Sequence, residues 1–331
     1  MGDLRLSICI PTYNFGQFIG ETLESIVGQQ ASDEVEIIVG DGGSTDNTAE
    51  VVKRYQAYFP RLTYHNFEKR SGVDLDLSRT VELARGDYCW LMSSDDVLRP
   101  GAIQRVLNEI TLEHTVYLLN RTMCDRNLKP VIRKNSWLPN GTPDAVYHFT
   151  DRSELLAYLN AAESIGALFS YISSIVVSRE KWSATGFDER FAGSNYAHVF
   201  RLFSMLKAGG SSLKYIKAPL VLCRGDNDSF LDKGLANRFR IDFDGYRLLG
   251  EVLFPDDESQ VALKAVMRRH HRWYNLLRLK SEIDEDFKWK EIENSLFSYN
   301  YGYWELFLIN TLGSSRLVVS SLRSVKKLLR A

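Results

Sequence analysis

Short apolar runs alternate with segments of helical period through the first part of the chain. The runs at 6–10, 35–39, 62–65 and 88–92 predict strands. Between them, apolar residues recur every three or four positions, which predicts helices. Strands and helices that alternate at this spacing favour a mostly parallel, doubly wound α/β sheet. Ligands bind such sheets beyond the carboxyl ends of the strands.

The pattern changes twice further along the chain. Residues 121–230 are less regular, and beyond residue 231 the period is helical almost to the end. We therefore expect one α/β domain at 1–230, with halves at 1–120 and 121–230, and a helical region at 231–331.

Composition narrows the class of protein. The chain has 331 residues, 44% of them hydrophobic, and a net charge of -1. A chain of this length can bury a sizeable hydrophobic core. Its net charge is close to zero, so it lacks the excess of basic residues that is typical of proteins that bind nucleic acid. The four cysteines form no CxxC pair, no secretory h-region follows Met1, and no run reaches the roughly 18 apolar residues of a membrane span. We expect a cytoplasmic protein.

A segment rich in glycine and hydroxyl groups, 39–48, follows the second expected strand. Its glycines let the backbone turn sharply beside a ligand. Asp41 stands at the strand's end, where its carboxylate can accept hydrogen bonds from a nucleobase or ribose. A turn followed by a helix N-cap is the alternative interpretation, and it fits Asp46 and Asn47. The position of Asp41 favours ligand binding.

Two adjacent carboxylates, Asp95 and Asp96, follow the fourth expected strand. They repel each other unless a cation lies between them and a bound polyanion. A divalent metal that bridges a carboxylate and a diphosphate does this, and it stabilises charge on the leaving group. Taken alone, such a pair is more often a helix cap. Together with Asp41 on a neighbouring strand, it predicts a metal site.

These segments together resemble glycosyltransferase family 2, with its GT-A fold. The resemblance is carried by Ile10-Pro11-Thr12-Tyr13-Asn14, residues 41–48, Ala84-Arg85-Gly86-Asp87-Tyr88 and Ser94-Asp95-Asp96. It implies a metal-dependent transferase in which Asp96 and Asp95 bind Mg²⁺ or Mn²⁺. The nucleoside site that it implies consists of Pro11, Thr12, Tyr13, Asp41, Gly72 and Asp95. Residues 1–120 would bind the nucleotide sugar, and 121–230 the acceptor.

A second set of segments is similar to the abequosyltransferase group of O-antigen enzymes: residues 86–90, 169–174, 196–200 and 223–230. This similarity implies transfer of a sugar, in this group a deoxy- or dideoxyhexose, from a nucleotide diphosphate sugar. A CDP-sugar is the donor that it favours. The acceptor would be a hydroxyl of a lipid-linked oligosaccharide in O-antigen or other surface-polysaccharide synthesis.

The chain departs from the family at two points. Ser93 stands where the acidic motif usually begins with Asp, and Asn195 with Tyr196 stand where a Glu–Asp pair usually supplies the general base. His198 can take a proton near neutral pH, and Asp188 and Glu189 are further catalytic candidates. A structural histidine and a helix cap explain these residues equally well. The base and the stereochemistry stay open, and a degenerate transferase that acts as a glycan-binding or scaffold protein is the alternative.

Two further segments are candidates for binding. Arg224 has the planar fork that suits phosphate oxygens, and Asp226 and Asn227 can bind sugar hydroxyls; a polar turn is the alternative interpretation. Residues 314–331 contain no acidic residue, and they place apolar positions on one helical face with basic positions beside it. That pattern is typical of an interfacial helix on anionic lipid, so we expect peripheral contact with the inner membrane; a domain-covering helix or a subunit contact is the alternative.

Overall fold

The computed structural model describes residues 3–29, 33–131, 136–227, 234–283, 286–315 and 317–321. The chain divides into two compact units. The first comprises 1–162 with 166–227, and the second comprises 163–165 with 228–331.

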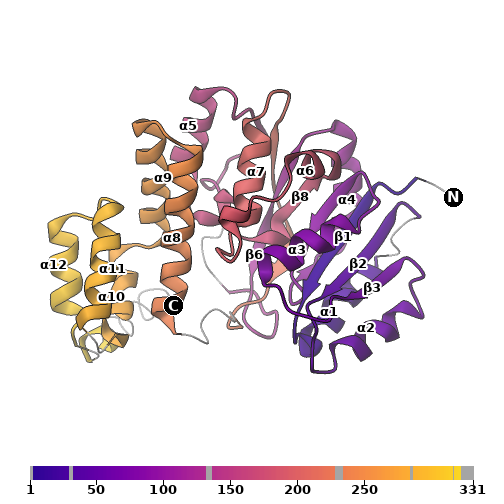
Figure 1. The fold of residues 1–331 in the computed structure, drawn as a ribbon, viewed down its shortest axis with the longest axis horizontal. Helices are drawn as coiled ribbons and strands as arrows, with labels where there is room; N and C mark the ends of the chain where they lie inside the picture. Colours follow the sequence, from indigo (N-terminus) through magenta and orange to yellow (C-terminus); the bar gives the residue numbers. More distant parts are fainter. Residues whose placement is uncertain are drawn as a thin grey trace. The chain divides into compact units, whose positions relative to one another are not determined.

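The first unit contains one mixed sheet, with nine strands among its described residues. The strands are β1 (Leu6–Thr12), β2 (Val35–Asp41), β3 (Leu62–Asn66), β4 (Tyr88–Leu91), β5 (Val97–Leu98), β6 (Val116–Met123), β7 (Ala145–Tyr147), β8 (Ile175–Ser178) and β9 (Leu213–Cys223). Their order is β3-β2-β1-β4-β8-β6-β9-β5, with β7 also paired to β9 (Figure 1). Strands β3, β2, β1 and β4 are parallel to one another, whereas β8 runs antiparallel between β4 and β6. The predicted mostly parallel α/β sheet is confirmed.

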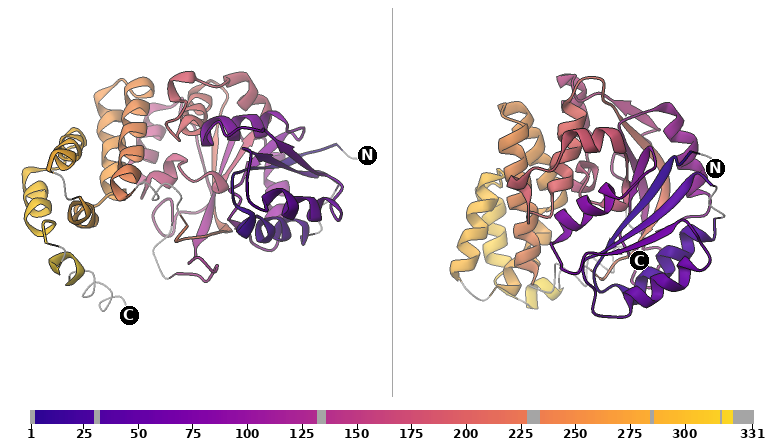
Figure 2. Two further views of the ribbon diagram at one scale, coloured as in Figure 1. Left: turned by 60° about the horizontal axis from the view of Figure 1, so that its bottom comes forward. Right: turned by 45° about the vertical axis from the view of Figure 1, so that its right-hand side comes forward.

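Helices cover both faces of this sheet because successive strand residues alternate between the faces. Ile8, Ile37 and Trp90 share one core with α1 (Gly16–Val27), α2 (Thr48–Gln56) and α4 (Ala102–Glu109). The other face is covered by α3 (Val73–Glu82), α6 (Arg179–Thr185) and α7 (Ala197–Lys207) (Figures 1 and 2). Helix α5 (Arg152–Ala161) and 3₁₀ turns at Ile110–Leu112, Ile165–Leu168, Ile172–Ser174 and Glu189–Phe191 complete the described elements up to β9.

The turn before β4 is fixed by a buried carboxylate. Glu36 on β2 is 1% exposed and accepts hydrogen bonds from the Ser7 hydroxyl at 2.7 Å and the Arg85 backbone N–H at 2.7 Å. The Arg85 guanidinium donates to the second oxygen of Glu36 at 2.7 and 2.9 Å. A Cβ on Gly86 would lie 2.9 Å from the Leu6 carbonyl carbon, so only glycine fits there. This network sets β4, and the acidic loop that follows it, against β1.

The second unit is helical, as the sequence predicts beyond residue 231. Its helices are α8 (Leu235–Leu253), α9 (Asp257–His270), α10 (Trp273–Glu282), α11 (Asp286–Ser298) and α12 (Tyr303–Leu312). Stacked rings lie in its core: Phe239 and Phe243 are 3.8 Å apart between centroids, and the Tyr299 hydroxyl donates to the Phe243 carbonyl at 2.6 Å. None of the helices in the described part of the chain is long and apolar enough to cross a bilayer.

Candidate functional site

The loops after β1 and β2 are joined by hydrogen bonds. Asn14 donates its backbone N–H to the Ser44 hydroxyl at 2.8 Å, and its side-chain oxygen accepts from the Thr45 N–H at 2.8 Å. The Gly16 N–H donates to Asp46 at 2.9 Å, and Asp46 also accepts from the Thr48 N–H at 3.0 Å. The two loops therefore form one rigid rim at the carboxyl ends of β1 and β2.

Asp41 lies at the centre of this rim, in register with Thr12 on β1 and Asn66 on β3. One carboxylate oxygen accepts from the N–H and the hydroxyl of Ser44 at 2.8 and 2.7 Å. The other accepts from the Tyr64 hydroxyl at 2.6 Å. Burial and the nearby carboxylate raise the pKa of Tyr64, so this hydroxyl stays protonated and keeps donating. Asp41 thus organises the floor of the rim.

The other residues expected at the nucleoside lie at the same edge of the sheet. Pro11 and Tyr13 are half-buried, and the buried Thr12 hydroxyl has no hydrogen-bond partner among the described residues. The Arg70 guanidinium carbon stacks 4.3 Å from the centroid of the Tyr13 ring. Gly72, with φ of 94°, precedes α3, and a side chain there would meet open space. Their role in nucleoside binding stays a prediction.

Asp96 is the more buried of the two candidate carboxylates that follow β4, and it is 2% exposed. One oxygen accepts from the hydroxyls of Tyr171 at 2.7 Å and Ser173 at 2.6 Å, and the other accepts from the Arg224 N–H at 2.9 Å. Burial, which is the larger cause, and the negative charge of Asp95, which is the smaller one, raise the pKa of Asp96 to about 7. A cation beside this carboxylate would restore its ionised form.

Asp95 accepts hydrogen bonds from the Ser93 hydroxyl and from the side-chain amide of Asn227. Ser93, which replaces the usual first acidic residue, therefore binds the second one. A carboxylate offers about four acceptor positions, so Asp95 retains capacity for a further ligand. Paired carboxylate oxygens suit Mg²⁺ or Mn²⁺, which complete their shells with water and phosphate oxygens. The residues present fit a divalent metal.

Arg224 ties the end of β9 to this acidic loop. Its buried guanidinium donates to the backbone carbonyls of Asp95 at 2.8 Å and Arg126 at 2.7 Å, and it pairs with Glu21 on α1. These contacts give Arg224 a structural role, and its predicted contact with diphosphate would have to form in addition to them. Asp226 is exposed beside it, with φ of 59°.

His198 lies in the first turn of α7 and is buried. Its Nε2 is 3.0 Å from the Phe169 carbonyl, and since a carbonyl only accepts, Nε2 carries the proton. Nδ1 has no hydrogen-bond partner among the described residues. Burial lowers the pKa of His198 to about 4. These contacts favour a structural role over the base role expected from the sequence.

The lowered pKa of His198 predicts a loss of stability in acid. The unfolded chain takes up the proton near pH 6.5 but the folded chain only near pH 4, so stability falls as pH drops through this window. Between pH 7 and pH 5 this group should cost about 2 kcal/mol of unfolding free energy. Urea unfolding of wild type and His198→Gln at both pH values measures it. The pH-dependent loss should shrink by that amount in the variant, and equal losses would contradict the assignment.

Asp188 and Glu189 lie in a turn before α7. The Asp188 carboxylate accepts from the Arg190 N–H at 3.0 Å and pairs with the Arg190 guanidinium at 2.7 Å, and these contacts lower its pKa. Glu189 is exposed in the first position of the 3₁₀ turn. The cap interpretation explains Asp188, and a catalytic role for either residue stays a prediction.

A different carboxylate reaches the place where the family usually has its Glu–Asp pair. Asp74, buried in the first turn of α3, accepts from the backbone N–H groups of Asn195 at 2.8 Å and Ala197 at 3.1 Å. Burial raises the pKa of Asp74, and these backbone donors oppose the rise. No side chain of its own caps α7, so Asp74 acts as its N-cap from another helix. An acidic residue at a position where the family often carries polar or basic groups is the one sequence feature that points to this contact.

The motif at 169–174 gains a physical explanation from Tyr171 and Ser173, which orient Asp96. A further charged residue in this region, Arg121, was not predicted as a site residue from the sequence. Its guanidinium carbon lies 3.5 Å from the centroid of the Trp137 ring and 5.2 Å from that of Tyr171. Its Nη1 is buried with no hydrogen-bond partner among the described residues. A cation is therefore stacked beside the acidic pair.

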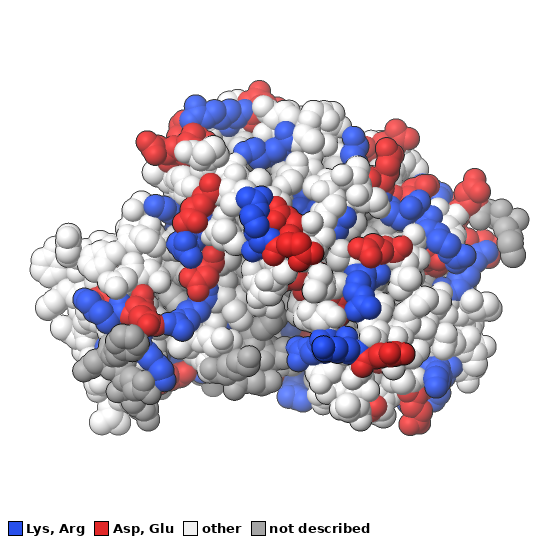
Figure 3. Space-filling view, viewed as in Figure 1, with Lys and Arg blue, Asp and Glu red and all other residues white. Residues whose placement is uncertain are grey.

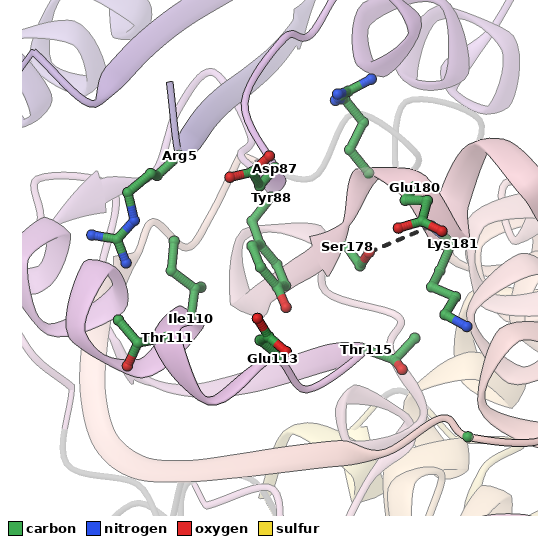
Figure 4. Close-up of a pocket in the computed structure, with 12 residues that line it drawn as sticks. Arg5, Asp87, Tyr88, Ile110, Thr111, Glu113, Thr115, Ser178, Glu180 and Lys181 are labelled. Carbon is green, nitrogen blue, oxygen red and sulfur yellow. Dashed lines mark hydrogen bonds between the residues drawn. The ribbon is translucent and has the colours of Figure 1, made fainter. Parts of the chain in front are cut away.

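A cavity of about 640 Å³ lies elsewhere in the first unit (Figure 4). Arg5 and Asp87 on its wall immediately precede β1 and β4, so it lies at the amino ends of these strands. Asp41 and Asp95 follow the carboxyl ends of parallel strands, at the opposite edge of the sheet. The cavity is separate from the candidate site.

The second unit contains the one cluster of three histidine or acidic ligand atoms found among the described residues: Asp242, His270 and His271. His271 Nε2 is 2.9 Å from the Asp242 carboxylate, and Arg238 pairs with the same carboxylate. Because a guanidinium already balances the charge of Asp242, we assign the cluster to a buried ion-pair network.

Comparisons with known proteins show which family the sequence is similar to. Residues 7–201 match the family described as Glycosyl transferase family 2. The chain is 36% identical over 275 residues to the abequosyltransferase RfbV of Salmonella typhimurium, covering 82% of each chain.

Solved structures share the GT-A fold. Residues 1–349 of TarS from S. aureus, in complex with UDP-GlcNAc, align with a TM-score of 0.63 at 17% identity, over 89% of this chain and 80% of that one. The mannosyltransferase PcManGT from Pyrobaculum calidifontis, in complex with GDP-Man and Mn²⁺, aligns with a TM-score of 0.55 at 15% identity, over 97% of this chain and 87% of that one. Fold and sequence together confirm the resemblance: the chain is a glycosyltransferase and belongs to glycosyl transferase family 2.

Proposed function

We propose that this glycosyltransferase moves a deoxy- or dideoxyhexose from a CDP-sugar to a hydroxyl of a lipid-linked oligosaccharide in surface-polysaccharide synthesis. The observation that carries the proposal is the joint placement of Asp41, Asp95 and Asp96 at the carboxyl ends of β2 and β4, on either side of β1. The similarity to an abequosyltransferase along 82% of the chain supports the class of sugar. Residues 1–120 would bind the donor and 121–230 the acceptor.

The metal dependence of transfer belongs to the same proposal. Asp95 and Asp96 would bind Mg²⁺ or Mn²⁺, and such an ion supplies positive charge to the leaving diphosphate. Tyr171 and Ser173 orient Asp96 through one carboxylate oxygen, and the other oxygen, which accepts from the Arg224 N–H, keeps spare acceptor capacity. The manganese complex of PcManGT supports a metal in this fold.

The pyrimidine would lie over the rim formed by the loops after β1 and β2. Both cytosine and uracil present an N–H donor on the edge away from the ribose, and Asp41 is the acceptor at that rim. The Tyr13 ring, stacked under Arg70, offers a flat surface to the base. Asn227, which already donates to Asp95, and the exposed Asp226 are placed to meet the sugar hydroxyls.

Peripheral contact with the inner membrane would bring the enzyme to such an acceptor. Five basic residues lie between 314 and 331 with no acidic one, which favours an anionic surface. The interfacial helix expected there falls largely on residues 322–331, outside the described residues.

A donor panel tests the function. The full chain is incubated with CDP-, UDP-, GDP- and dTDP-sugars and a lipid-linked oligosaccharide, with Mg²⁺, with Mn²⁺ or with EDTA. Nucleotide release and sugar transfer are followed together. We expect transfer from a CDP-sugar that EDTA abolishes. No turnover with any donor, combined with retained glycan binding, would instead support the scaffold alternative.

A further inference from the structure

The second unit carries an apolar surface that its core does not use. Of the ten exposed large hydrophobic side chains in the described part of the chain, six lie between residues 297 and 318. We call these six residues the aromatic face: Phe297, Tyr303, Trp304, Phe307, Leu317 and Val318. Tyr303 and Trp304 are 84% and 77% exposed. Isolated exposed apolar residues are common, but a cluster this large marks an interaction site.

Four residues of the aromatic face form two ring pairs, one between α11 and α12 and one within α12. The rings of Phe297 and Tyr303 are 5.5 Å apart between centroids, and those of Trp304 and Phe307 are 5.8 Å apart. Leu306 and Ile309 point into the unit and are buried, so α12 is apolar on both its inner and its outer side. The surface over α12 is largely free of charged side chains in Figure 3.

Residues 303–331 carry five basic side chains and one acidic side chain. Glu305, the acidic residue of α12, is paired with Arg268 at 2.8 Å. The chain that follows α12 adds Arg316, Arg323, Lys326, Lys327 and Arg330 without an acidic residue. Two copies of this chain that met through the face would bring these like charges together, whereas an anionic lipid surface attracts them. Trp and Tyr are also the side chains enriched at the water–lipid boundary.

We propose that the aromatic face inserts into the headgroup region of an anionic phospholipid bilayer, with Trp304 and Phe307 as its principal anchors. The benefit of this contact to catalysis rests on the lipid-linked acceptor of the proposed function, but the contact itself does not. Trp and Phe side chains would enter the interface, and anionic headgroups would attract the net positive charge of the sequence at 303–331. The surface keeps the enzyme at the bilayer without a membrane-spanning helix.

Vesicle binding by the full chain tests this surface. Wild type, Trp304→Ser/Phe307→Ser and Tyr58→Ser are sedimented with vesicles of phosphatidylcholine alone or mixed with phosphatidylglycerol. Tyr58 is the matched control because it is 78% exposed and lies in the first unit. We expect wild type and Tyr58→Ser to bind the anionic vesicles, and the double variant to bind at least about tenfold more weakly. Equal binding of all three proteins would overturn the proposal.

Tryptophan fluorescence gives a second readout. Four of the six tryptophans, Trp90, Trp137, Trp182 and Trp289, are buried, and Trp273 is half-buried. Trp304 is therefore the tryptophan most open to quenchers in the lipid. Brominated lipid should quench wild-type emission, and Trp304→Phe should lose most of this quenching. The alternative occupant is a second copy of this chain. It would be supported if wild type does not bind vesicles but forms a dimer in sedimentation velocity that the double variant cannot form. This result would overturn the proposal.

Donor turnover separates this inference from the proposed function. The double variant should release nucleotide at the wild-type rate with a detergent-solubilised acceptor. Vesicle binding without turnover of any donor would contradict the proposed function and leave the aromatic face supported. Turnover without vesicle binding would support the proposed function and contradict the membrane role of the aromatic face.

Discussion

Asp96→Asn is expected to lower the rate of sugar transfer about 100-fold or more, with the fold retained. The amide offers one acceptor oxygen where the carboxylate uses two, so the contacts from Tyr171, Ser173 and the Arg224 N–H cannot all persist. It also removes a negative charge from the proposed metal site, whose ion would stabilise the leaving diphosphate by several kcal/mol. Initial rates with saturating donor and Mg²⁺ measure the loss.

Asp87→Asn is the matched control for this variant. Asp87 is exposed at the amino end of β4, whereas Asp96 follows the carboxyl end of the same strand. The control should retain the wild-type rate. Circular dichroism and thermal unfolding show whether Asp96→Asn remains folded. A folded variant with an unchanged rate would refute the role of Asp96.

Proton release gives this prediction a readout that a purely structural residue would not move. Burial and Asp95 raise the pKa of Asp96 to about 7 in the metal-free chain, so part of the carboxyl is protonated near neutral pH. Metal binding favours the anion and should therefore release protons, and metal affinity should rise as pH increases from 6 to 8. Calorimetry in buffers of different ionisation enthalpy measures the release, which Asp96→Asn should abolish.

The residues predicted best from sequence are those fixed by strand pattern and local motif. Thr12 and Asp41 end two neighbouring parallel strands, and their register follows from the alternation of apolar runs and helices. The residues that orient Asp96 are 75 and 77 positions away, and nothing local identifies Tyr171 or Ser173 as its partners. Such contacts depend on how β8 inserts between β4 and β6, which periodicity does not reveal.

The sequence around His198 indicates burial as well as a possible role in catalysis. The segment Ala197–Phe203 is apolar except for His198 and Arg201, and a helix that is apolar on nearly all sides is buried. Both polar residues make hydrogen bonds inside the unit, His198 with the Phe169 carbonyl and Arg201 with the Trp182 carbonyl at 2.9 Å. These contacts favour the structural alternative for His198, and its catalytic role stays a prediction.

Asp74→Asn is expected to lower kcat about 10- to 100-fold while changing the donor KM less than about threefold. Asp74 fixes the loop before α7 through the N–H groups of Asn195 and Ala197, and an asparagine amide can accept both of these hydrogen bonds only poorly. The loop stands where the family usually carries its catalytic pair, and small misplacements of reacting groups can cost 10²-fold. The nucleoside rim makes no use of this contact.

Hydrogen exchange distinguishes this positioning role from general damage. The amides of Asn195 and Ala197 should exchange faster in Asp74→Asn, whereas those of β1 and β2 should keep their protection. Glu82→Gln, an exposed change at the last position of α3, serves as the control and should leave kcat and exchange unchanged. A slow variant with unaltered exchange in the loop would mean that Asp74 acts on substrate directly. Because α7 lacks a cap of its own, Asp74 on α3 caps it, and α3 thereby fixes the position of the loop before α7.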